Sequence, residues 1–140
     1  MDQPQTLLPY PDFGRSAACL SQQHLGAQRI HTLMILHTLN GETNDWRNYP
    51  ATLMWRGHLE ALVEYGVAMC DEWLQRGFID TCRPRIIAQS WGDAVRHPPW
   101  LGDEAFHLAQ QAALLRLDRY HYRPHFPTTP DNLPYVWPNP

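Results

Sequence analysis

Residues 51–76 read ATLMWRGHLEALVEYGVAMCDEWLQR, and this stretch decides the fold that the sequence predicts. Apolar residues recur in it at helical spacing, and Gly77 follows where a helix end favours a left-handed residue. A helix from Ala51 to Arg76 would be about 39 Å long at roughly 1.5 Å per residue. Gly66 in its middle lowers helix propensity, so we expect a close helix crossing or a bend there.

Two further long helices are predicted, one on each side of this stretch. The first runs from Ser21 to Leu39, and its apolar side carries Leu25, Ile30, Leu33 and Leu36. The other runs from Asp103 to about Tyr120. Between the second and third helices, Ile86-Ile87 could seed either a short strand or a helical turn.

The two ends of the chain lack this periodicity. Two prolines and a glycine within residues 7–14 prevent regular structure, so residues 1–14 are predicted to form a turn-rich arm. Residues 122–140 are rich in proline and aromatic residues, which are costly to leave in water, so we expect an extended tail packed on the helices. Because 140 residues suffice for one core and not for two, we predict a compact, all-α single domain covering residues 1–140.

The charged residues limit the possible functions. All eleven basic residues are arginines, so no lysine side chain can form a Schiff base. The formal net charge is −3 and the pI is about 6.2, far from the basic composition of a general DNA-binding domain. Any contact with nucleic acid would therefore have to be local.

Several other classes of protein are not indicated. Three cysteines without a CxxC motif predict neither a disulfide framework nor a zinc site. Eight histidines occur without a metal-binding motif, so we expect no metal, and no cofactor is implied. No apolar run approaches the roughly 18 residues of a membrane span, and the start does not resemble a signal peptide. We expect a cytoplasmic monomer that does not bind membranes.

Cationic and aromatic residues gather where the central helix emerges from its preceding loop. Arginine side chains can hold a phosphate through bidentate hydrogen bonds, and a tyrosine can stack on a base. The candidate ligand-binding residues are Arg47, Asn48, Tyr49, Arg56 and His58. The alternative is that Arg47 and Arg56 form a solvated helix entrance paired with Glu60 or Asp45.

Two further residues, Trp55 and Arg29, could serve the fold instead of a binding site. Trp55 could stack on a base, but it lies on the apolar stripe and is better explained as core. Arg29 falls among apolar residues of the first long helix, so it needs a carboxylate partner, for which Asp12 and Glu60 are candidates.

Three polar residues fall on the opposite side of the first long helix from its apolar stripe. At about 100° per residue, His24, Gln28 and His31 lie within roughly 60° of one another. Histidine can act as a general acid or base near neutral pH, so these three residues are the candidate catalytic group. The alternative is that they are surface or hydrogen-bonded helix residues.

Several motifs resemble those of a known family. Leu59-Glu60-x-Leu62, Leu74-x-Arg76-Gly77-Phe78 and Gln23-His24-Leu25 are similar to the pyrimidine-dimer DNA glycosylase family, also called phage-type endonuclease V. Leu8-Pro9-Tyr10-Pro11-Asp12-Phe13 and Trp100-Leu101-Gly102-Asp103-Glu104 further resemble small bacterial proteins distantly related to it. The resemblance implies an all-α DNA repair enzyme, a hydrolase and lyase that removes a damaged pyrimidine and then nicks the abasic site.

The resemblance also implies a changed mechanism. In the family, the amine of an N-terminal threonine is the nucleophile and a glutamate supports the sugar cation. Thr6 aligns best with that threonine, but five residues precede it and its amine is in a peptide bond. The glutamate position falls on His31. An imidazole could instead protonate the leaving base or orient a water, with His24 and Gln28 positioning the ligand.

Two main hypotheses follow. The first is an enzyme that cleaves an N-glycosidic bond in DNA or in a nucleotide-like ligand. The second is a noncatalytic descendant that binds DNA or a nucleotide through Arg47, Arg56 and His58. A small enzyme acting on a non-nucleic-acid substrate is a third possibility. We predict that His31 and the two arginines line one cleft between the first two long helices.

Overall fold

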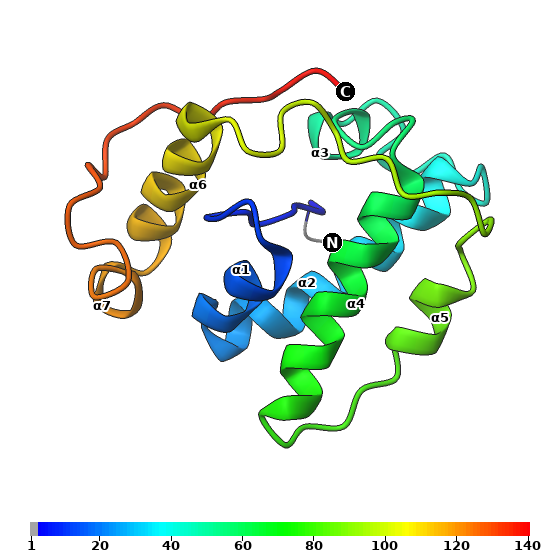
Figure 1. Ribbon diagram of the computed structural model, residues 1–140, viewed down its shortest axis with the longest axis horizontal. Helices are drawn as coiled ribbons and strands as arrows, with labels where there is room; N and C mark the ends of the chain where they lie inside the picture. Colours follow the sequence, from blue (N-terminus) through cyan, green and yellow to red (C-terminus); the bar gives the residue numbers. More distant parts are fainter. Residues whose placement is uncertain (1–2) are drawn as a thin grey trace.

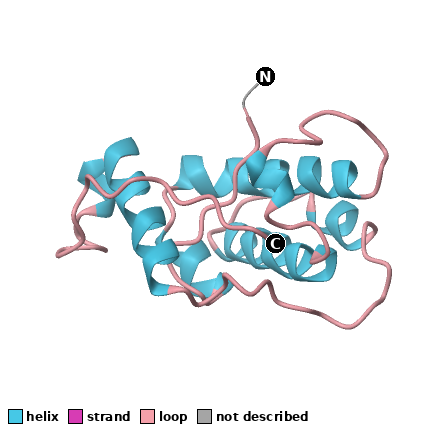
Figure 2. Cartoon of the chain, turned by 90° about the horizontal axis from the view of Figure 1, so that it is seen from above, coloured by secondary structure: helices cyan, strands magenta, loops and turns pink. Residues whose placement is uncertain are grey.

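A computed structural model describes residues 3–140 as helices joined by loops (Figures 1 and 2). Seven helices and no strand lie within these residues, so the all-α prediction is confirmed. In chain order the helices are α1 (Phe13–Cys19), α2 (Gln22–Leu39), α3 (Pro50–Leu53), α4 (Leu59–Gln75), α5 (Arg83–Ile87), α6 (Glu104–Leu117) and α7 (Arg119–Tyr122).

Helices α2 and α4 cross closely at Gly66. A Cβ atom on this glycine would lie 2.6 Å from Cγ2 of Thr32 on α2, so any larger residue would force the two helices apart. The close crossing expected at Gly66 is confirmed. The packed pair forms the centre of the molecule, with α1 against α4 on one side and α5 on another.

The single helix predicted from Ala51 to Arg76 is wrong, because the chain leaves the helical conformation between α3 and α4. Gly57 has a φ of +84° there, which residues with a β-carbon rarely adopt. Trp55, just before it, is fully buried in the core, as its apolar spacing indicated, and its Nε1–H donates to the hydroxyl of Thr6 at 3.1 Å. The break turns the residues after Trp55 outward.

The first fourteen residues are more regular than predicted, since α1 begins at Phe13. The side chain of Asp12 caps this helix by accepting a hydrogen bond from the backbone N–H of Arg15 at 2.7 Å. Residues 3–11 remain non-helical and form the arm. Residues 1 and 2 of the predicted arm lie outside the described part of the chain.

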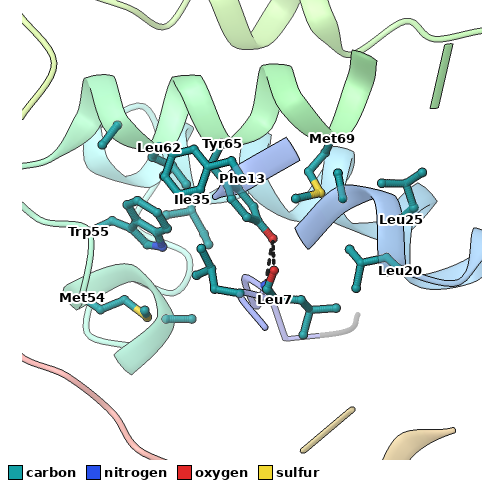
Figure 3. Close-up of a cluster of buried hydrophobic side chains, with 14 of the residues drawn as sticks. Leu7, Phe13, Leu20, Leu25, Ile35, Met54, Trp55, Leu62, Tyr65 and Met69 are labelled. Atoms are coloured by element: carbon teal, nitrogen blue, oxygen red, sulfur yellow. Dashed lines mark hydrogen bonds between the residues drawn. The ribbon is translucent and has the colours of Figure 1, made fainter. Parts of the chain in front are cut away.

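The arm passes through the interior, between α6 and the crossing of α2 with α4 (Figure 1). Leu7 and Leu8 are buried there. The N–H of Leu7 donates to the Tyr65 hydroxyl at 2.8 Å, and that hydroxyl lies 3.1 Å from the Leu7 carbonyl oxygen (Figure 3). The Leu8 N–H donates to Oε1 of Gln110 at 3.0 Å. Side chains of α4 and α6 thus replace the backbone partners that the arm lacks.

The prediction of which residues of α2 face the core is partly wrong, because the buried arm packs beside this helix. Ile30, assigned to the apolar side, is 52% exposed, whereas Gln28, assigned to the polar side, is 2% exposed. Gln28 faces inward because its Oε1 accepts hydrogen bonds from the Leu7 N–H at 3.2 Å and from the Tyr65 hydroxyl at 2.6 Å. A buried backbone segment therefore places a polar residue on the core side of this helix.

Arg29 forms the expected structural ion pair, but its partner is Asp80 and not Asp12 or Glu60. Nη1 of Arg29 lies 2.5 Å from Oδ1 of Asp80, whose side chain is 1% exposed. Burial opposes ionisation of Asp80, but hydrogen bonds from Arg29 and from backbone N–H groups outweigh it and lower the pKa of this carboxyl. The Arg29 guanidinium also lies 4.3 Å from the centre of the Trp73 ring.

The remaining elements refine the sequence expectations. Of the two structures open to Ile86-Ile87, the chain forms the helical turn, as α5. The helix predicted over 103–120 is interrupted at Asp118, whose side chain accepts from the His121 N–H at 3.1 Å and starts α7. No helix within residues 3–140 is long and apolar enough to cross a membrane.

After α7 the tail runs extended across α6 and ends near α3 (Figure 1). Nη1 of Arg116 donates to the carbonyl oxygens of Asp131 and Leu133 at 2.8 and 2.9 Å. The ring of Trp137 packs on Tyr49 with a centroid distance of 6.1 Å. Polar and aromatic contacts thus hold the tail to the helices.

Candidate functional site

One cleft, with a volume of about 970 Å³, brings together three of the predicted ligand-binding residues. Arg47, Arg56 and His58 line it together with the end of α2, the start of α4 and the loop 91–96. In the described part of the chain neither Arg47 nor Arg56 forms an ion pair. The pairing with Glu60 or Asp45 that was the alternative for these arginines is absent from these residues.

The break between α3 and α4 gives the cleft its cationic wall. Nη2 of Arg56 donates to the carbonyl oxygen of Arg47 at 3.3 Å, which keeps the two residues adjacent. His58 follows Gly57, and its Nδ1 lies 3.2 Å from the carbonyl oxygen of Arg96. Because a carbonyl oxygen only accepts, this Nδ1 carries the proton. The imidazole therefore ties the loop of Arg96, a third arginine of the cleft, to the start of α4.

The N-terminus of α4 adds a further anion-attracting feature to this wall. His58 occupies the N-cap position and makes no side-chain hydrogen bond to the first turn. The first backbone N–H groups of a helix have no partner within it, and the helix dipole favours negative charge at this end. Thr52 also lines the cleft and is fully buried, and its Oγ1 has no hydrogen-bond partner among residues 3–140.

Sequence reasoning missed the carboxylates and the tryptophan of this cleft. Glu60, Asp93 and Trp91 all contribute to the lining. Oε2 of Glu60 accepts a hydrogen bond from the backbone N–H of Trp91 at 2.9 Å, and Oε1 of Glu60 accepts from the Ser90 hydroxyl. Ser90 and Trp91 lie 30 and 31 positions after Glu60 in the chain. The one local signal was an aromatic residue beside Gly92 in a segment without periodicity.

Two of the predicted ligand-binding residues do not line this cleft. Asn48 is exposed on the loop before α3. The hydroxyl of Tyr49 donates to Oε1 of Gln3 at 2.8 Å, and its ring packs edge-on against Trp46 and Trp137. Tyr49 therefore joins the arm to the tail.

The three predicted catalytic residues do not form one open polar face. His24 stacks on Tyr122 and its Nδ1 lies 2.6 Å from the tyrosine hydroxyl. Burial lowers the pKa of His24. Gln28 is inside the core, as described above. His31 is half-buried beside the arm, where its Nδ1 accepts a hydrogen bond from the Gln5 N–H at 3.4 Å.

The prediction that His31 and the arginines line one cleft is wrong, because His31 is not among the described residues around it. A smaller pocket of about 300 Å³ is lined by Met34, one helical turn after His31, and by Trp46. The two pockets are adjacent, since Thr38 and Thr43 line both. Thr38 lies seven residues after His31, which is about 10 Å along the helix axis. His31 itself is not among the described residues that line either pocket.

Trp46, which lines the smaller pocket, has an unusual backbone conformation and an unpartnered indole N–H among the described residues. Its φ is +63°, which is uncommon for a residue other than glycine. Its indole Nε1–H is buried without a hydrogen-bond partner in the described residues. Strained backbone and unpartnered buried donors persist where the surrounding fold enforces them, and such residues gather at functional sites.

The titratable residues of the described chain do not suggest metal chemistry. Within residues 3–140 no group of three histidine, cysteine or carboxylate side chains is placed to hold a metal ion. The three cysteines are buried and unpaired, and burial raises the pKa of Cys19 to about 12. The cleft itself is lined by arginine, histidine, carboxylate and aromatic side chains, among other residues.

Comparison with known proteins gives one family. The sequence profile of the family described as pyrimidine dimer DNA glycosylase matches residues 5–85, which is more than half of the chain. The match includes the arm from Gln5 onward and all of α1 to α4, and it ends within α5. Neither the curated proteins nor the solved structures contain a significant match to this chain.

Proposed function

Because the chain belongs to the pyrimidine dimer DNA glycosylase family, we propose that it cleaves the N-glycosidic bond of a damaged or modified base in DNA or a nucleotide. The observation that carries this proposal is the cleft in which Arg47 and Arg56, without carboxylate partners among residues 3–140, lie beside the uncapped start of α4. Such a wall suits a phosphate group. With a formal net charge of −3 for the whole chain, contact with DNA would be confined to this wall.

His31 is the residue that we propose for the chemical step. The family resemblance implies a glutamate at this position, and the arm passes beside His31 at Gln5. A neutral imidazole cannot stabilise a sugar cation as a carboxylate does. A protonated imidazole can donate a proton to the departing base, which is general acid catalysis. The proposal requires one strand to contact both the arginines of the cleft and His31 on α2.

The noncatalytic alternative, a protein that only binds DNA or a nucleotide, is favoured by a separate observation. His24 and Gln28, proposed to position the ligand, make hydrogen bonds to Tyr122, Tyr65 and the arm. Thr6, the aligned counterpart of the family's nucleophile, is 2% exposed and accepts a hydrogen bond from Trp55. These residues serve the fold, so the catalytic group would reduce to His31.

N-glycosidic cleavage in a duplex oligonucleotide with one thymine dimer tests the two candidates. The detached thymine stays joined to its partner through the dimer, so cleavage is read as an alkali-labile abasic site. We expect wild-type protein to form this abasic site. His31→Gln should lose at least about a hundredfold in rate, the usual contribution of a general acid. His31→Glu restores the family's carboxylate and is the matched second variant.

Three outcomes separate the candidates. Loss of activity in both His31 variants supports imidazole as the catalytic group. Activity that appears only in His31→Glu, together with wild-type binding, supports the noncatalytic descendant. Borohydride trapping on an abasic-site oligonucleotide completes the test, since a covalent adduct would show that an amine attacks the sugar and that the family's imine route operates here.

A further inference from the structure

We propose that Trp91 is the platform on which the cleft stacks an unpaired nucleobase, so that the ligand is a single-stranded or extruded nucleotide. This inference rests on the proposed function, because it assumes that the cleft holds nucleic acid. It adds a ligand-contacting residue outside the family match, which ends at residue 85.

The exposure of Trp91 sets it apart from the core tryptophans. Trp91 is 67% exposed at the edge of the cleft, whereas Trp55 and Trp100 are 0% and 5% exposed. An exposed indole presents a large apolar face to water, and such faces gain free energy when a planar group covers them. Nucleobases are planar, and stacking on an aromatic side chain suits any base.

The position of Trp91 is fixed by Glu60 and Ser90. Glu60 accepts hydrogen bonds from the Trp91 N–H and from the Ser90 hydroxyl. Oγ of Ser90 in turn accepts from the N–H of Gly92 at 3.0 Å. Gly92 has a φ of +76°, which allows the chain to turn directly after the indole. A short loop that is exposed to solvent is therefore anchored on a helix at the residue that carries the aromatic ring.

Two more contacts hold the same loop to α4. Nε2 of His97 lies 2.8 Å from Oε1 of Glu64, and His58 binds the carbonyl oxygen of Arg96. Glu60 and Glu64 are four residues apart and so lie on one face of the helix. The segment from Ser90 to His97 thus has anchors at both ends, and ligand binding would not have to order it first.

The chemistry around Trp91 selects the form of the ligand. The indole can cover a base while Arg47, Arg56 and Arg96 neutralise a neighbouring phosphate. In a duplex, both faces of each base are already covered by adjacent pairs. An indole at the edge of a cleft can therefore reach only a base that is unpaired or has been extruded from the helix.

Two fluorescein-labelled single-stranded oligonucleotides test this inference. One carries 2-aminopurine as its only base on an otherwise tetrahydrofuran abasic backbone, and the other carries tetrahydrofuran at that position as well. The emission of 2-aminopurine falls when the base stacks. Wild-type protein should quench 2-aminopurine and bind its oligonucleotide more tightly. Trp91→Ala should abolish the quenching and weaken binding of that oligonucleotide by about tenfold, whereas Trp91→Phe keeps most of both. The abasic probe should bind Trp91→Ala and wild type equally.

The matched control is Tyr120→Ala, which removes an aromatic residue that is 96% exposed and does not line the cleft. It should change neither signal. Equal quenching and affinity in wild type and Trp91→Ala would overturn the stacking role while leaving the proposed function intact. Failure of wild-type protein to bind either probe would also overturn the inference, whereas the assay on the thymine-dimer duplex decides the proposed function separately.

Discussion

Polar side chains surround both the buried arm and the open cleft. Those around the arm bind its backbone, whereas the arginines around the cleft remain open to solvent. Around the arm, Gln28 and Gln110 are almost fully buried and bind the backbone of Leu7 and Leu8. Around the cleft, Arg47 and Arg56 are exposed and have no carboxylate partner within residues 3–140. Polar residues therefore indicate a binding surface only where no buried backbone group uses them as hydrogen-bond partners.

The arm needs such partners because it is neither helix nor strand. Each buried backbone N–H or carbonyl without a hydrogen bond costs free energy. A sheet or helix would satisfy these groups internally. Here glutamine, histidine and tyrosine side chains from α2, α4 and α6 do so. We therefore expect substitutions inside to cost stability and substitutions around the cleft to cost ligand affinity.

The largest expected effect comes from the buried ion pair. Arg29→Met should lower the free energy of unfolding by about 3–5 kcal/mol, because it leaves the buried Asp80 carboxylate without its guanidinium. Urea denaturation at pH 7 measures this. Arg83→Met is the control, since the side chains of Arg83 and Asp71 are 41% and 55% exposed, and such a surface pair contributes at most about 1 kcal/mol. Equal losses of unfolding free energy in the two variants would contradict the expected difference between a buried and an exposed ion pair.

The hydrogen bonds to the arm should give the next largest effect. Gln110→Leu removes the acceptor of the Leu8 N–H at a position that is 2% exposed. We expect a loss of about 1–3 kcal/mol, the cost of one unsatisfied buried donor. Gln75→Leu, at the exposed end of α4, should change stability by less than about 0.5 kcal/mol. A stabilising Gln110→Leu would mean that the arm is not held as described.

His107 should make stability depend on pH. Its Nδ1 lies 2.8 Å from the Leu8 carbonyl oxygen and its Nε2 accepts from the Gly102 N–H at 2.9 Å. Both contacts fit the neutral ring, and burial lowers the pKa of His107 below its ordinary 6.5. The unfolded chain therefore binds a proton first as pH falls. The stability from neutral His107 is complete above pH 6.5 and decreases below it.

His107→Asn tests that dependence while keeping a donor near the Leu8 carbonyl oxygen. Between about pH 5 and 6.5, its urea midpoint should fall less steeply with decreasing pH than that of wild type. Some slope should remain, because burial also lowers the pKa of His24 and His125. Identical slopes in the two proteins would show that His107 does not contribute. Above this range the slopes should agree.

The sequence predicted most of the fold and part of the site, for identifiable reasons. The extent of α2 and the close approach at Gly66 were predicted correctly, because local residue patterns indicate both. The break at Gly57 was missed because Trp55 and Leu59 keep the helical apolar spacing across it. The start of α1 at Phe13 was missed because its N-cap residue, Asp12, follows two prolines that indicate turns.

The site was predicted where its residues are neighbours in the chain and missed where they are not. Arg47, Arg56 and His58 lie close together in the chain, on either side of the short helix α3, and their grouping was visible in the sequence. Glu60 and Trp91 meet only because the loop after α5 returns to α4. No local spacing encodes that return. Gln28 was misassigned because its partner, the arm at Leu7, is 21 residues away.

The smallest effect on stability should come from the cleft. Arg47→Gln and Arg56→Gln should each leave the urea midpoint nearly unchanged, since both residues are exposed and unpaired with carboxylates in the described chain. Each should weaken binding of a single-stranded oligonucleotide and lower the slope of log Kd against log salt concentration by about 0.7, the value for one lost phosphate contact. Arg83→Gln, another exposed arginine away from the cleft lining, should alter neither quantity. Since the interior variants should change stability without altering the salt slope, a cleft variant that unfolds the protein, or an Arg29→Met protein that changes the slope, would show that the two regions are not separate.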